Sequence, residues 1–278
     1  MYLILKASVP LDLKGLPVQP RHVSLNDLKL SRVYCVLKAY FDESYDGSTM
    51  CVGGWLCTED GWKLIEDKWL ARIAHENRMS VKKGHPPITR YHATYCANLK
   101  KEFSATNGWS VERQIQLTKK LIGIVGNADP QPIGIVIGLS LNELRLVRPD
   151  FTDKELKWWA YRFCMGDCLN NIGKAVHEWF THDTVTVIHD GDGGDLDVAA
   201  LEAYQDVKRS RRSYAHQFVA MTPGEWRNYP ALQPADMLAY EGFKFTAARK
   251  RGSQTLRKSL EGFIGHDVII RAGYFNCQ

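Results

Sequence analysis

Two strand-forming segments near the start of the chain constrain the fold more than any other feature. RVYCVLKAYF (32–41) and STMCVGGWLC (48–57) are rich in β-branched and aromatic residues, and only the turn-forming DESYDG separates them. A connection this short joins antiparallel neighbours, because a parallel pair needs a crossover of about a dozen residues or more. The sequence therefore predicts a sheet that begins with an antiparallel hairpin.

After this hairpin, helix and strand patterns alternate. The expected elements are, in chain order, a helix at 62–79, a helix at 110–127, a strand at 132–141, a helix at 152–180 opened by the capping box Thr152-Asp-Lys-Glu155, a strand at 184–190, a helix at 195–210, a strand near 216–221 and a helix at 233–250. This order predicts an α/β fold, a mixed sheet with helices on both faces.

Pro10, Pro17 and Pro20 make residues 1–30 an N-terminal extension, so we expect one domain over 31–278, with a tail after about 250.

Composition excludes two broad classes of protein. Aromatic residues make up 11% of the chain, which is too many for a disordered polymer. No apolar run approaches the roughly 18 to 20 residues of a membrane span, and the opening MYLILKASVP lacks the basic start of a signal peptide. The seven cysteines are odd in number and scattered, which favours a reducing compartment. We therefore expect a cytoplasmic protein without membrane contact.

The charge distribution favours a polyanionic partner. Asp183 to Asp206 carries seven acids and no Lys or Arg, whereas Asp206 to Lys258 carries eleven basic residues against four acids. A metal-dependent enzyme acting on nucleic acid would use both segments, although two solvated helix faces give the same pattern. The basic residues expected to contact nucleic acid are Lys208, Arg209, Arg211, Arg212, Arg249, Lys250 and Arg251. Arg249 to Arg251 also suit a helix C-terminus.

Acidic residues stand at the edges of three predicted elements. Asp42 and Glu43 end the first strand, and Asp190 ends TVTVIHD, with Asp192 two residues later. Asp236 lies in the first turn of the last helix, amid apolar neighbours. Turn formation explains the strand-end acids equally well, and helix capping is an alternative for Asp236.

Taken together, these carboxylates predict a metal site at one rim of the sheet. Carboxylate oxygens select hard cations, so Asp42, Asp190, Asp192 and Asp236 are the expected ligands of Mg²⁺ or Mn²⁺. Three or four carboxylates are what two-metal phosphoryl transfer needs. Glu43 ranks second as a ligand, because strand alternation sends it to the face opposite Asp42.

Several short segments of the sequence resemble motifs of the family called domain of unknown function 3800. They are YFDES (40–44), GGWLC, GWKLIEDKW, YHATY and LQPADMLAYE (232–241), and together they span about 34 to 247. The resemblance implies a ribonuclease H-like fold, whose catalytic carboxylates sit on the first strand, the fourth strand and a late helix. It carries over to Asp42, Asp190 and Asp236. His92 of YHATY also matches a family position, where a histidine assists the leaving group or guides water.

These observations favour a metal-dependent nuclease that uses water as the nucleophile and a basic surface for the nucleic-acid backbone. One alternative is a catalytically silent ribonuclease H-like module that binds nucleic acid or protein in a defence or mobile-element system. A protein partner or a second copy of the chain fits either hypothesis. A nucleotide-sugar transferase using Asp190-x-Asp192 is a third, which the opening hairpin disfavours because that class needs an early βαβ unit.

Overall fold

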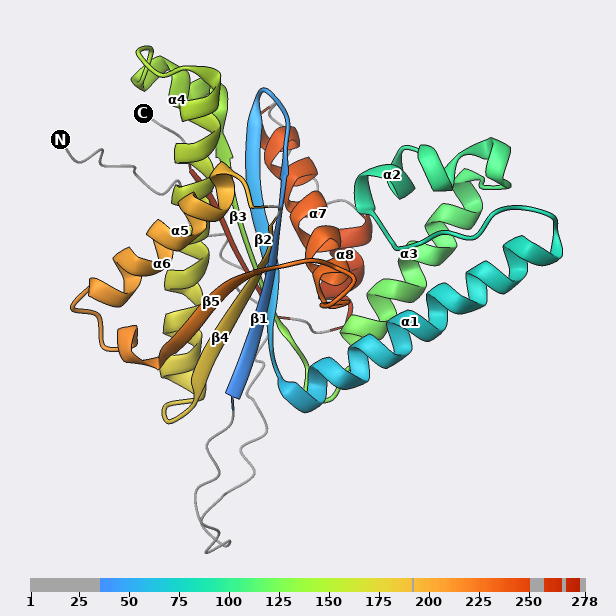
Figure 1. Ribbon diagram of the computed structural model, residues 1–278, viewed down its shortest axis with the longest axis horizontal. Helices are drawn as coiled ribbons and strands as arrows, with labels where there is room; N and C mark the ends of the chain where they lie inside the picture. Colours follow the sequence, from blue (N-terminus) through green and yellow to red (C-terminus); the bar gives the residue numbers. More distant parts are fainter. Residues whose placement is uncertain (1–35, 192, 251–257, 267–268, 276–278) are drawn as a thin grey trace, which may run out of the picture.

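A six-stranded sheet covered by helices on both faces forms the centre of the protein (Figure 1). The computed structural model describes residues 36–191, 193–250, 258–266 and 269–275. The strands are β1 (Val36–Tyr45), β2 (Thr49–Thr58), β3 (Ile133–Ser140), β4 (Thr184–Asp190), β5 (Phe218–Gly224) and β6 (Ile270–Phe275). The α-helices are α1 (Glu59–Lys82), α2 (Ala93–Ala97), α3 (Val111–Gly126), α4 (Leu141–Val147), α5 (Asp153–Trp179), α6 (Asp195–Arg209), α7 (Leu232–Lys250) and α8 (Lys258–Ile264), with 3₁₀ turns at Lys101–Phe103, Ala105–Asn107 and Ala215–Gln217.

The strand order of the sheet is β5-β4-β1-β2-β3-β6. β1, β2 and β3 are antiparallel neighbours, whereas β4 runs parallel to β1, β5 parallel to β4, and β6 parallel to β3. The predicted hairpin and the predicted mixed α/β sheet are therefore confirmed. Because β1 and β4 are parallel neighbours, their carboxyl ends lie at the same edge of the sheet.

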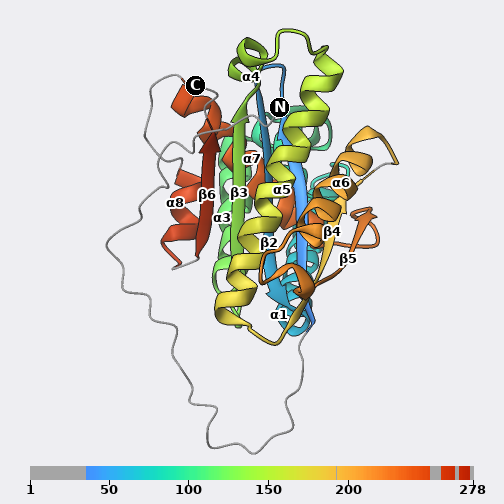
Figure 2. The same cartoon turned by 90° about the vertical axis from the view of Figure 1, so that its left-hand side faces the viewer.

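Each face of the sheet packs against its own helices. α5 and α6 cover one face, seen toward the viewer in Figure 2, and α7 covers the other. Two separate hydrophobic clusters fill these layers, one around Leu37, Phe41 and Tyr161, the other around Trp55, Trp69 and Leu238. α1, α2 and α3 project from the α7 side as a helical arm (residues 59–126; Figure 1).

Most predicted elements are confirmed, including the capping box, in which Thr152 and Glu155 each bond the other's backbone N–H. The chain after residue 250 differs from the expected tail. It contains α8, and β6 pairs with β3 as an edge strand. The short apolar run of β6 gives too weak a periodic signal to be distinguished from irregular chain. The predicted extension at 1–30 lies outside the described residues, and no helix in the described part of the chain is long and apolar enough to span a membrane.

Candidate active site

The first two acids of the predicted site occupy the last part of β1. Asp42 pairs with Gly53 of β2, and a Cβ atom at Gly53 would lie 2.6 Å from the backbone nitrogen of Ala239. Only glycine permits α7 to approach the sheet this closely. Successive strand residues point to opposite faces, so Asp42 faces α7 and Glu43 faces α5. The main charge neighbours of the two side chains differ accordingly: Asp236 for Asp42 and Asp190 for Glu43.

Asp42 and Asp236 form the first carboxylate pair. Burial raises the pKa of Asp42 well above its usual range, and the negative charge of Asp236 is the next largest cause, followed by Glu43 and Asp190. The backbone N–H of Glu43 donates a hydrogen bond to Asp42 Oδ1 at 2.7 Å, which opposes the rise. A buried carboxylate beside another carboxylate binds protons, or any other cation, more tightly than a free one does.

Glu43 and Asp190 form the second pair, at the adjacent carboxyl ends of β1 and β4. Burial raises the pKa of Glu43 to about 7, and Asp190 is the largest charge contribution to that rise. Lys157 of α5 lowers it again, and Asp236 raises it slightly. The fold therefore brings together all four described carboxylates that the sequence predicts, Asp42, Glu43, Asp190 and Asp236. The fifth, Asp192, lies outside the described residues.

Asp236 is the fifth residue of α7, because the helix begins at Leu232, one residue earlier than predicted. Its Oδ2 atom accepts a hydrogen bond from the backbone nitrogen of Ala93 in the helical arm, at 2.8 Å. His92 Nδ1 lies 3.3 Å from the same oxygen. The predicted capping role would have linked Asp236 to its own helix, whereas this carboxylate links α7 to the start of α2.

A cavity of about 700 Å³ opens beside the second pair. Its lining includes Glu43 and Asp190 and three further acids, Asp195 and Asp197 of α6 and Glu225, and its basic residues are Arg90, Lys154, Lys157 and Arg227. Asp42 and Asp236 are not part of the lining. The sequence prediction missed Asp197, although Asp197 belongs to the acidic segment 183–206, because nothing in the sequence shows which of those acids faces the sheet.

Two polar groups near the cavity lack hydrogen-bond partners among the described residues. Asp197 Oδ2 accepts from Gly193 N at 2.6 Å, but its buried Oδ1 atom accepts no hydrogen bond. The Tyr161 hydroxyl of α5 is fully buried and unpaired, and burial together with Glu43, Asp42 and Asp197 raises its pKa far above the usual range. His189 Nδ1 lies 3.7 Å from Asp197 Oδ1. Buried polar atoms without hydrogen bonds are uncommon in folded proteins, and these two are close to the carboxylates.

The predicted basic residues lie apart from the carboxylates. Lys208 and Arg209 end α6, about 18 Å along the helix from Asp197, and Arg249 is about 20 Å along α7 from Asp236. Lys208 donates to Phe218 O at 2.7 Å, and Arg212 donates to Asn170 and to the Tyr214 hydroxyl, while Arg211 is exposed. Arg251 falls outside the described residues, as does the side chain of Lys250. None of the described members lines the 700 Å³ cavity.

Within the part of the chain that the structure describes, no group of three His, Cys, Asp or Glu side chains stands ready to hold a metal ion. The donor set at the sheet edge nevertheless has the oxygen chemistry of a hard-cation site. Searches for related proteins give no further assignment: no family model matches the chain, and no curated protein matches it.

Proposed function

We propose that this chain is a Mg²⁺- or Mn²⁺-dependent nuclease with a ribonuclease H-like core. The observation that carries the proposal is the clustering of Asp42, Glu43, Asp190 and Asp236 at one sheet edge, where each of Asp42 and Glu43 has its pKa raised by neighbouring carboxylates. Carboxylates that raise one another's pKa repel each other when charged, and bound divalent ions would remove that repulsion. Placement on β1, β4 and α7 also matches what the resemblance to domain of unknown function 3800 implies.

The pairing of the carboxylates suits two metal ions. Asp42 with Asp236 would hold one ion, and Glu43 with Asp190 the other. Glu43 thereby becomes a principal ligand and not a secondary one, because it lines the cavity and has Asp190 as its main charge neighbour. Asp197 Oδ1 and the Tyr161 hydroxyl, which have no hydrogen bond in the described structure, would bond to the metal ligands or to water on the ions. When bound, the ions supply an activated water and stabilise charge on the leaving oxygen.

The remaining residues of the site have simpler roles. His92 lies against Asp236 and would orient that carboxylate or pass a proton to the leaving group. Ala93 N fixes one oxygen of Asp236, which leaves the other free for a cation. Lys157 offsets part of the negative charge near Glu43, so the empty site remains compatible with folding.

The test is divalent-dependent cleavage of single- and double-stranded DNA, RNA and hybrids by the full chain. We expect cleavage with Mg²⁺ or Mn²⁺, none with EDTA, and a loss of at least about 10³-fold in Asp42→Asn. Asp67→Asn, an exposed acid of α1, is the matched control and should retain full activity. Binding of nucleic acid without any metal-dependent cleavage would favour the catalytically silent module instead.

A further inference from the structure

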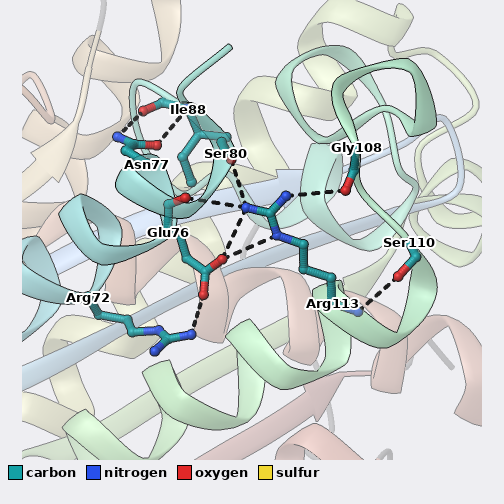
Figure 3. A network of polar contacts seen from close by, with 8 residues as sticks. All are labelled: Arg72, Glu76, Asn77, Ser80, Ile88, Gly108, Ser110 and Arg113. Atoms are coloured by element: carbon teal, nitrogen blue, oxygen red, sulfur yellow. Dashed lines mark hydrogen bonds and ion pairs between the residues drawn. The ribbon is translucent and has the colours of Figure 1, made fainter. Parts of the chain in front are cut away.

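The segment 88–93, called the strap below, is the part of the helical arm that contacts α7, and hydrogen bonds hold it at both ends. The Asn77 side chain of α1 donates to Ile88 O at 2.9 Å and accepts from Ile88 N at 2.8 Å (Figure 3). At the other end, Gln233 of α7 accepts from Tyr91 N at 2.8 Å, and Gln233 itself is 3% exposed. Backbone held at both ends by side-chain amides loses little further entropy when a ligand binds to it.

The strap presents Arg90 to the cavity beside the carboxylates. Ile88 and Tyr91 are buried, whereas Arg90 between them is half-buried and lines the cavity. Its guanidinium carbon lies 5.2 Å from the ring centroid of Trp226, which follows β5. Arg227 lies 4.8 Å from the same centroid. A guanidinium stacked on an aromatic ring keeps its N–H edge available for another partner.

Arg90 also differs from the other basic residues of the cavity in its charge partners. Lys154 pairs with Asp195 at 2.9 Å, Arg227 lies 3.6 Å from Glu225, and Lys157 acts on Glu43. Arg90 takes part in no ion pair among the residues that the structure describes. A cation that is oriented, unpaired and adjacent to a proposed cleavage site has the properties of a substrate-binding residue.

We propose that Arg90, held against Trp226, binds a backbone phosphate of the nucleic-acid strand next to the phosphodiester that the carboxylates engage. This inference rests on the proposed function, because it names a subsite of the same cavity. The guanidinium fork fits two phosphate oxygens at once, and the strap and the indole ring set its direction before the strand arrives. The subsite reads the backbone and not the bases, so it serves strands of any sequence.

The test measures binding of a fluorescein-labelled single-stranded 12-nucleotide DNA or RNA to Asp42→Asn protein in Mg²⁺, which suppresses cleavage. In this background, Arg90→Gln should weaken binding about five- to tenfold and reduce the salt slope of log K by about 0.7, the loss of one phosphate contact. Trp226→Ala should weaken binding severalfold, whereas Trp226→Phe, which keeps an aromatic ring, should stay within about twofold. Arg78→Gln is the matched control, because Arg78 of α1 is exposed and does not line the cavity.

A structural role for Arg90 would lower the melting temperature but leave the salt slope unchanged, so both are recorded for each variant. An unchanged slope in Arg90→Gln, or an equal loss in Arg78→Gln, overturns the subsite while leaving the nuclease proposal intact. If the parent protein binds no oligonucleotide, the proposed function fails, and calorimetric titration with pyrophosphate tests the subsite separately. Pyrophosphate binding that Arg90→Gln abolishes supports an anion site at Arg90; absence of binding to the parent overturns the inference as well.

Discussion

Glu76 in the helical arm and Asp42 in the sheet are both carboxylates that folding removes from water, but their surroundings are opposite. Glu76 is 7% exposed and accepts hydrogen bonds from Arg72 and, at 3.2 Å, from Nε and Nη2 of Arg113 (Figure 3). Asp42 accepts one backbone hydrogen bond and faces other carboxylates. The first arrangement neutralises its charge and the second does not.

This difference separates a structural carboxylate from a functional one. The attraction between two buried charges of opposite sign offsets part of the free-energy cost of their desolvation. Removing either charge leaves the other buried without a partner. Like charges held together instead raise the free energy of the folded protein until a cation binds. The Glu76 network therefore stabilises the arm that carries the strap, whereas the Asp42 cluster lowers stability, and the proposed cation binding would restore it.

The largest effect should come from breaking the neutralised site. Glu76→Gln leaves Arg113 and Arg72 partly buried without their carboxylate, so the free energy of unfolding should fall by about 3 kcal/mol or more. Urea denaturation measures the loss, with Asp67→Asn on the same helix expected within about 0.5 kcal/mol of the parent. A loss below about 1 kcal/mol would mean that the network contributes no more than a surface ion pair.

The second prediction concerns the pH dependence of the uncompensated site. The pKa of Glu43 is about 7 in the folded protein and 4.5 ordinarily, so between these values the folded state keeps a proton that the unfolded state releases. Without metal, the free energy of unfolding should therefore rise as the pH falls from about 8 to about 5, by on the order of 2–3 kcal/mol from this group. Asp42 acts in the same direction, because its pKa is also raised.

Comparison of Glu43→Gln with the parent isolates the contribution of Glu43 to the pH dependence of the free energy of unfolding, since the other titrating groups are common to both proteins. The variant should lose most of the rise between pH 8 and pH 5, whereas Glu112→Gln, an exposed acid of α3, should keep it. Added Mg²⁺ should stabilise the parent more at pH 8 than at pH 6, because protons compete with the ion for the same oxygens. Parallel stability curves for Glu43→Gln and the parent would place Glu43 in an ordinary, solvated environment.

The sequence was sufficient to predict those parts of the site that depend on strand ends. Asp190 terminates β4 as predicted, whereas β1 continues past Asp42 and Glu43 to Tyr45 and does not end at these acids. The alternation of side chains along β1 separates Asp42 from Glu43 without any tertiary information. Asp236 was identifiable because a carboxylate among apolar helix neighbours needs a partner, although the partner, Ala93 of the arm, was not.

The residues that were missed lie on elements whose orientation only packing decides. Asp197, Lys157 and Tyr161 belong to helices whose rotation about their own axes is set by contacts with the sheet, and Arg90 lies in a loop that the sequence describes only as basic and proline-containing. The density of charge in 208–212 is the strongest basic signal in the sequence. The fold nevertheless places it at the far end of α6, whereas isolated basic residues from three segments surround the cavity.

The smallest expected effect, at Asp236, separates charge from hydrogen bonding within the uncompensated cluster. Asp236→Asn removes the repulsion with Asp42 and keeps an oxygen that accepts from Ala93 N, so the metal-free variant should be at least as stable as the parent. Asp236→Ala removes both and leaves that N–H without its acceptor, which should cost about 1–3 kcal/mol. Thermal melts with and without about 5–10 mM Mg²⁺ or Mn²⁺ complete the comparison, because both variants should lose most of the stabilisation that the ion gives the parent. If Asp236→Asn destabilises the metal-free protein and responds to metal as the parent does, Asp236 belongs with Glu76 as a structural carboxylate, and the first metal-binding pair must be sought elsewhere.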